Sequence, residues 1–150
     1  MSNPHHTSPG AWAKRLHLAS RAMIERILRP HGLGATQWYV LCQLALYGPT
    51  PQRDFPALLQ IEKPTLSDVV SALVRKGLIS QTPDPTDQRQ RVLELTDSGK
   101  ALWAELPDPI AIILKTAFDG FDQATLDTVT HVLRTATERL NAYEPEGTEK

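Results

Sequence analysis

Residues 63–76 carry cationic and hydroxyl side chains at a spacing that would place them on one surface. Leu66, Val70 and Leu73 recur at three- and four-residue steps, which predicts a helix with these three side chains turned inward. The outer surface would offer hydroxyl groups to bases or phosphates and cations to phosphates, so the predicted chemistry is nucleic-acid binding. The side chains on that surface are Lys63, Thr65, Ser67, Asp68, Ser71 and Arg75.

Two arginines farther along the chain would add phosphate contacts. Residues 78–82 and 89–95 have strand-like patterns, and the turn-rich stretch 83–88 lies between them. This order predicts a β-hairpin that exposes Arg89 and Arg91. Arginines in a hairpin are often merely solvated, so a binding role for this pair depends on the helices beside it.

The charge balance limits this hypothesis without excluding it. The formal net charge of the 150-residue chain is -1, whereas affinity for phosphate depends on Lys and Arg. The basic residues are unevenly distributed, however: five lie between residues 75 and 100, while residues 101–130 hold five acids and one lysine. Such an asymmetry allows a modestly basic face on a nearly neutral molecule.

The sequence lacks the motifs that catalysis, cofactor binding or metal binding would require. No glycine-rich phosphate loop or nucleophile elbow occurs, so the sequence predicts neither an enzyme nor a bound cofactor. No pair of histidines stands at ligand spacing with a carboxylate or thiolate, so no metal site is predicted. The histidines are His5, His6, His17, His31 and His131.

Cys42 is the one cysteine of the sequence, so it cannot form a disulfide within the chain. It falls on the apolar side of a predicted helix, near Trp38, Leu41 and Leu46. Two interpretations remain, a small buried hydrophobic residue or a redox-sensing thiol, and the apolar neighbours favour the first.

Several helices must hold these surfaces in place. Residues 11–29 repeat apolar side chains at helical spacing, and residues 122–142 do so behind Asp122, a predicted cap. Both patterns are typical of helices that pack lengthwise. Thr36 is predicted to cap a second helix, and residues 50–51 are predicted to open a short third one, because threonine and proline suit the first helical positions.

A connecting helix is predicted over residues 97–119, with Thr96 as its cap. The prolines within residues 107–109 lack amide hydrogens and their rings clash with the preceding turn, so the helix should be interrupted there. The polar residues 1–10 and 143–150 are predicted to be disordered tails.

The predicted elements form one domain over residues 11–142. Helix, turn, helix and hairpin over residues 36–100 predict a winged helix-turn-helix, within a mainly α fold that has a small β-hairpin wing. No apolar run approaches the roughly 18 residues of a membrane span, and the start lacks a secretion signal. The expected location is therefore the cytoplasm, with no membrane partner.

The motifs in this region resemble the MarR (multiple antibiotic resistance regulator) family. They are LLQIEKPTL at 58–66, LVRKGLI at 73–79, DQR at 87–89 and LTDSG at 95–99. The resemblance implies a homodimer joined by N- and C-terminal dimerisation helices, with each winged lobe reading half of a pseudo-palindromic site in double-stranded DNA. It also implies a transcriptional repressor that a small aromatic or anionic ligand releases.

The resemblance assigns roles to individual residues as well. Asp87 and Arg89 match the family's Asp-x-Arg signature, in which the aspartate shapes the wing and basic side chains approach the minor groove. The family's ligand pocket lies between the dimer base and the DNA-binding lobe. At the corresponding positions this sequence has His17, Arg21, Trp38, Tyr39 and Trp103, which would combine aromatic walls with a cationic anchor.

The sequence departs from the family pattern at two places. Asp68 and Ala72 stand where relatives often carry basic or amide side chains for base contact, and residues 107–109 interrupt a helix that is usually long. The alternative hypothesis is therefore a winged-helix module that binds another protein and has weak or no affinity for DNA.

Overall fold

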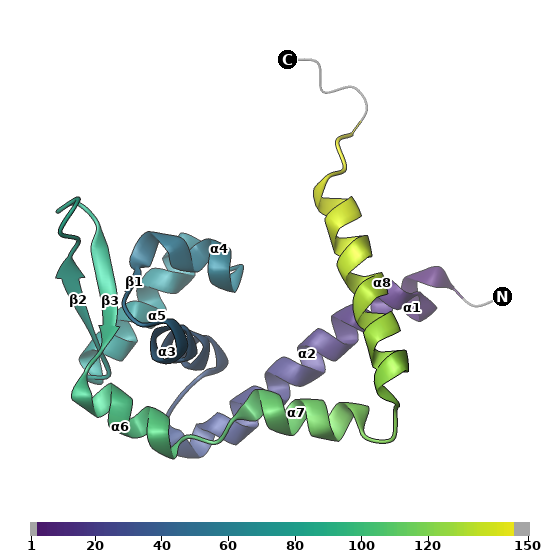
Figure 1. Cartoon of the computed structure of the whole chain (residues 1–150), viewed down its shortest axis with the longest axis horizontal. Helices are drawn as coiled ribbons and strands as arrows, with labels where there is room; N and C mark the ends of the chain where they lie inside the picture. Colours follow the sequence, from purple (N-terminus) through teal and green to yellow (C-terminus); the bar gives the residue numbers. More distant parts are fainter. Residues whose placement is uncertain (1–2, 146–150) are drawn as a thin grey trace. The chain divides into compact units, whose positions relative to one another are not determined.

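The computed structural model describes residues 3–145, and its contacts divide the chain into two compact units at Ile110 and Ala111 (Figure 1). The sequence predicted one domain over residues 11–142, and the division falls just after the predicted interruption. The helices of the first unit are α1 (Pro4–Thr7), α2 (Pro9–Leu28), α3 (Ala35–Tyr47), α4 (Phe55–Leu59), α5 (Lys63–Arg75) and α6 (Asp97–Glu105), with 3-10 turns at Arg29–His31 and Gln52–Asp54.

A three-stranded antiparallel sheet forms the wing and its base. The strands are β1 (Thr50–Pro51), β2 (Ile79–Pro83) and β3 (Arg91–Leu95), in the order β1-β3-β2. The predicted hairpin is present. The predicted short third helix is also present as α4, but its predicted start at residues 50–51 is wrong. Thr50 instead pairs with Leu93, as an edge strand in which proline's missing amide is tolerated.

The core of the first unit surrounds α3, which contacts α2, α5, α6 and β3. Side chains from all parts of the unit are fully buried there, and each contributes about 1.5–3 kcal/mol by leaving water. This packing holds α5 and the hairpin in fixed positions beside each other (Figure 1). The largest fully buried side chains include Phe55, Leu28, Leu41, Leu73 and Leu93.

Residues 4–7 and 9–10 are helical, although the sequence predicted a disordered tail over residues 1–10. Asn3 accepts a hydrogen bond from the His5 amide at 3.0 Å, and Ser8 accepts one from the Ala11 amide at 3.2 Å. Each cap is followed by a proline at the start of α1 or α2, a position where the missing amide costs nothing. The long helix therefore begins at Pro9, earlier than the predicted residue 11.

Helix α3 begins differently from the prediction, which made Thr36 its cap. Gly34 is the cap residue, and the Gln37 side chain accepts a hydrogen bond from its amide at 3.3 Å. The buried Ala35 amide donates to Glu25 of α2 at 2.9 Å. A side chain of α2 thus accepts a hydrogen bond from a backbone amide in the first turn of α3. Local sequence patterns do not reveal such a contact.

The second unit contains most of α7 (Pro109–Phe118) and α8 (Gln123–Asn141). Asp122 caps α8 by accepting a hydrogen bond from the Thr125 amide at 2.7 Å, and the hydrogen bonds from Thr125 lower the pKa of Asp122. α8 buries none of its residues within the chain, and its apolar Val132 is 50% exposed. None of the described helices is long and apolar enough to span a lipid bilayer.

Candidate functional site

The polar side chains of α5 lie on an exposed face. Leu66, Val70 and Leu73 are buried, as their spacing predicted. The opposite side of the helix leaves a continuous row of hydroxyl and charged groups in solvent, with Ala72 half-buried at its margin. The structure places Lys63, Thr65, Ser67, Asp68, Ser71 and Arg75 in this row.

A tight turn between α4 and α5 sets the angle at which α5 is presented. Gln60 adopts a left-handed conformation with φ of 53°, which is uncommon for a residue other than glycine. The Ile61 amide closes the turn by donating to the Pro56 carbonyl at 3.0 Å. Phe55 is the buried residue of α4, whereas Leu58 is 53% exposed.

Asp84 organises the wing, a role that the sequence analysis missed. The residue is 8% exposed, and its carboxylate accepts hydrogen bonds from the Thr86 amide at 2.9 Å and the Thr86 hydroxyl at 2.8 Å. These hydrogen bonds lower the pKa of Asp84. Asp87 also contributes, by accepting from the Arg89 amide at 3.1 Å. The Asp-x-Thr spacing of an Asx-turn was the available signal.

A cationic cavity of about 380 Å³ lies between α5 and the wing. Arg53, Lys63, Arg89 and Arg91 all line it. The ion pair of Arg53 with Asp54 is 3.9 Å long and exposed, so it is weak and leaves the cavity's positive charge largely intact.

Arg53 and three glutamines, Gln52, Gln81 and Gln90, line this cavity, although the sequence did not predict that they contribute to the site. Gln81 of β2 donates to the Gln52 side chain at 2.8 Å, which ties the wing to the 3-10 turn after β1. Gln90 lines the same cavity. Because β1 was not predicted, nothing in the sequence indicated that residues 52–54 lie beside the wing.

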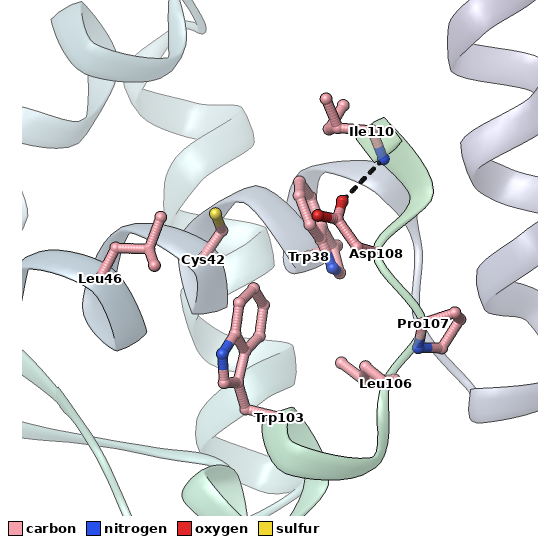
Figure 2. A pocket seen from close by; sticks show the side chains of 8 residues that line it. All are labelled: Trp38, Cys42, Leu46, Trp103, Leu106, Pro107, Asp108 and Ile110. Carbon is pink, nitrogen blue, oxygen red and sulfur yellow. Dashed lines mark hydrogen bonds between the residues drawn. The ribbon is translucent and has the colours of Figure 1, made fainter. Parts of the chain in front are cut away.

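The five predicted ligand-binding residues separate into two cavities. His17, Arg21 and Tyr39 line one of about 360 Å³, whereas Trp38 and Trp103 line another of about 400 Å³ (Figure 2). The structure therefore does not bring the predicted lining together as one pocket.

The first of these cavities carries positive charge. The Arg21 guanidinium donates to the Thr36 hydroxyl at 3.0 Å, which fixes its position at the cavity wall. Burial raises the pKa of Tyr39, and the nearby charge of Arg21 opposes that rise. An anion in this cavity would meet a cation and a phenol.

Cys42 lies half-buried in α3 and lines the second cavity. Burial raises the pKa of its thiol, and the negative charge of Asp108 raises it further. A raised pKa disfavours the reactive thiolate, which supports the interpretation of Cys42 as a packing residue. Within residues 3–145, no three His, Cys, Asp or Glu side chains cluster closely enough to hold a metal ion.

Comparison with known proteins identifies this arrangement. Residues 33–90 match the model of the MarR family, a stretch that runs through α3, α5 and the tip of the wing. Residues 33–90 therefore carry a MarR-family domain. The family and the winged, mainly helical fold predicted from the sequence are confirmed, although the sheet has three strands rather than two.

One curated relative of the chain is the HTH-type transcriptional repressor NicR of Pseudomonas putida. The two are 34% identical over 70 residues, which cover 47% of this chain and 44% of NicR. This chain spans about half the length of the curated relatives that it matches. These relatives are named as transcriptional regulators, not as enzymes.

Solved structures share the fold over most of the chain. BpsR of Bordetella bronchiseptica, whose DNA binding is regulated by 6-hydroxynicotinic acid, has a TM-score of 0.79 at 24% identity over 91% of this chain and 98% of its own. A MarR variant from E. coli complexed with operator DNA has a TM-score of 0.78 at 18% identity, over 91% and 99%. At these identities the likeness concerns the fold alone.

Proposed function

We propose that this chain is a DNA-binding transcriptional regulator in which α5 enters the major groove. The observation that carries the proposal is the exposed polar face of α5 beside a cavity lined by four cationic side chains. Arg89 and Arg91 on the wing would then reach the flanking phosphates or minor groove. The DNA-bound E. coli MarR variant, which has the same fold, supports this docking mode.

The regulator works as a homodimer on a pseudo-palindromic operator. Apolar side chains on the terminal helices support this: Trp12 and Leu16 on α2, and Val129, Val132 and Leu133 on α8, are all exposed in the single chain. A second copy would bury them and present a second α5 about one duplex turn, roughly 34 Å, away. Repression would follow from occlusion of the promoter. The relative NicR is likewise named a transcriptional repressor.

A gel-shift titration with the protein's own upstream DNA, repeated over a salt series, tests this proposal. Arg89→Ala should weaken binding to all sequences alike and lower the salt slope by about one. Arg134→Ala removes the same charge from the exposed surface of α8 and should leave the slope unchanged. Affinity that ignores salt would exclude phosphate-driven binding.

A small anionic aromatic is the proposed effector. The cavity with His17, Arg21 and Tyr39 supports it through the cation that Thr36 holds in place. The regulation of BpsR by an aromatic acid agrees with this choice. Calorimetric titration with aromatic carboxylates should show binding that Arg21→Gln abolishes and Lys14→Gln, an exposed neighbour on α2, retains.

The alternative function is a winged-helix module that binds protein rather than DNA. Two observations favour it: Asp68 stands exposed on the outer face of α5, and the net charge is -1. Selection of bound sequences from random duplexes separates the two functions. Enrichment of a two-fold symmetric site establishes the regulator, whereas recovery of no sequence favours the module.

A further inference from the structure

The cavity of about 400 Å³ that contains Trp38 and Trp103 differs in charge from the one with Arg21. It lies between α3, α6 and the segment that joins α6 to α7, so all of its lining residues belong to the first unit (Figure 2). Its walls are mostly apolar. Among its lining residues Asp108 is the one charged group.

Two indole rings give this cavity flat aromatic walls. The ring centroids of Trp38 and Trp103 lie 5.7 Å apart with 33° between their planes. Trp38 is 4% exposed and belongs to the core, whereas Trp103 is half-buried. Flat walls of this kind favour a planar ring, and indoles also attract cations to their faces.

The negative charge of Asp108 reaches the interior of the cavity. Its carboxylate accepts a hydrogen bond from the Ile110 amide at 3.0 Å, which fixes it at the start of α7. The same charge raises the pKa of the Cys42 thiol in the wall formed by α3, in addition to the larger effect of burial. An anion placed between these groups would be repelled, and a cation would be attracted.

One polar atom in the wall has no partner. The Trp38 indole nitrogen is buried without a hydrogen bond within the described part of the chain. A buried donor left unsatisfied costs stability. The nitrogen is closed to solvent, so an acceptor on a ligand reaches it only when a neighbouring side chain turns aside.

We propose that this cavity binds a small planar aromatic cation, such as a ring that bears an amidinium or a protonated ring nitrogen. Trp38 and Trp103 hold the ring, and Asp108 holds the charge. The site is separate from the proposed site for anionic effectors. It rests on side chains within the first unit and does not require that the protein bind DNA.

Three probes of equal shape and different charge test this site, namely benzamidinium, benzamide and benzoate. Benzamidinium should bind at least about tenfold more tightly than benzoate, measured in an Arg21→Gln background that silences the other cavity. Asp108→Asn keeps the capping group and should bring the ratio below about threefold. Asp119→Asn removes an exposed acid outside this cavity and should leave the ratio unchanged.

The indole signals of the three tryptophans locate the binding. In a ¹⁵N-labelled protein, benzamidinium should shift the indole resonances of Trp38 and Trp103 and leave that of Trp12, which is exposed on α2, in place. Shifts at Trp12 alone, a preference for benzoate, or a ratio unaffected by Asp108→Asn would each overturn the proposal. None of these results alters the outcome of the gel-shift titration, so the two proposals fail separately.

Discussion

The two units of the chain differ in how far they bury their apolar side chains. The first unit buries side chains from α2, α3, α5 and the sheet around a core of its own. In the second unit α8 buries nothing within the chain, although its apolar residues recur as regularly as those of α5. A helical pattern therefore predicts an apolar face but does not tell whether the same chain or another molecule covers it.

A charge on the apolar face of α8 should have the largest effect. Val132→Asp should prevent dimerisation, because a carboxylate cannot be buried there without a partner. DNA affinity should fall at least about 100-fold, since one winged lobe then binds without the avidity of two. Sedimentation analysis and gel shifts measure the two effects.

The control for that variant adds the same charge to the polar side of α8. His131 lies about one third of a helical turn from Val132 and is exposed, so His131→Asp is the matched variant. It should leave both the mass and the DNA affinity unchanged. A Val132→Asp protein that remained dimeric would show that α8 does not carry the interface.

Gly99 tests the claim that the first unit is closely packed by itself. A Cβ atom at Gly99 would lie 2.0 Å from the Leu78 carbonyl oxygen, so Gly99→Ala requires the backbone of α6 or β2 to move. We expect a loss of about 3 kcal/mol in the free energy of unfolding, measured in urea. Gly10→Ala, whose Cβ would meet only the Ser8 hydroxyl at 4.0 Å, should cost nothing.

Glu25 lies in the C-terminal half of α2, which contributes Ile24 and Leu28 to the core of the first unit. Glu25→Ala leaves the buried Ala35 amide without its acceptor and should lower the free energy of unfolding by about 1–2 kcal/mol. Glu25→Gln retains an acceptor oxygen and should recover most of that loss. Equal losses in the two variants would show that the charge, not the hydrogen bond, matters.

Asp84 should give the smallest effect, and one that depends on pH. Its folded pKa is lowered by Thr86, so the ionised carboxylate stabilises the wing above its unfolded pKa of about 3.9 and this contribution disappears as pH falls through the folded value. Asp84→Asn should therefore be less stable than the wild type at neutral pH and equal to it in strong acid. Thermal unfolding across that range provides the measurement, and a difference that persists in acid would contradict it.

Features set by neighbouring residues could be predicted from the sequence. The inward row of α5 follows from its spacing, and Thr96 caps α6 by accepting from the Gly99 amide at 3.0 Å. Asp122 caps α8 in the same way. The same local rules also apply to Pro4 and Pro9, but the polar composition around them led to the prediction of a tail.

Features that depend on distant pairing could not be predicted. Thr50 and Pro51 look locally like the start of a helix, and only their pairing with β3 makes them a strand. That pairing brings Arg53 to the cationic cavity. Likewise, Trp38 and Tyr39 are adjacent in α3 but point toward different cavities, since consecutive helical residues diverge by about 100°.

The prolines between α6 and α7 affect how motion passes along the chain. Continuous helices transmit rotation because every turn is locked to the next by hydrogen bonds between amides and carbonyls. Residues 106–108 lie outside both helices, and Pro107 and Pro109 have no amide hydrogen to extend either ladder. We therefore expect that rotation of α6 about its axis is not transmitted to α7 through backbone hydrogen bonds.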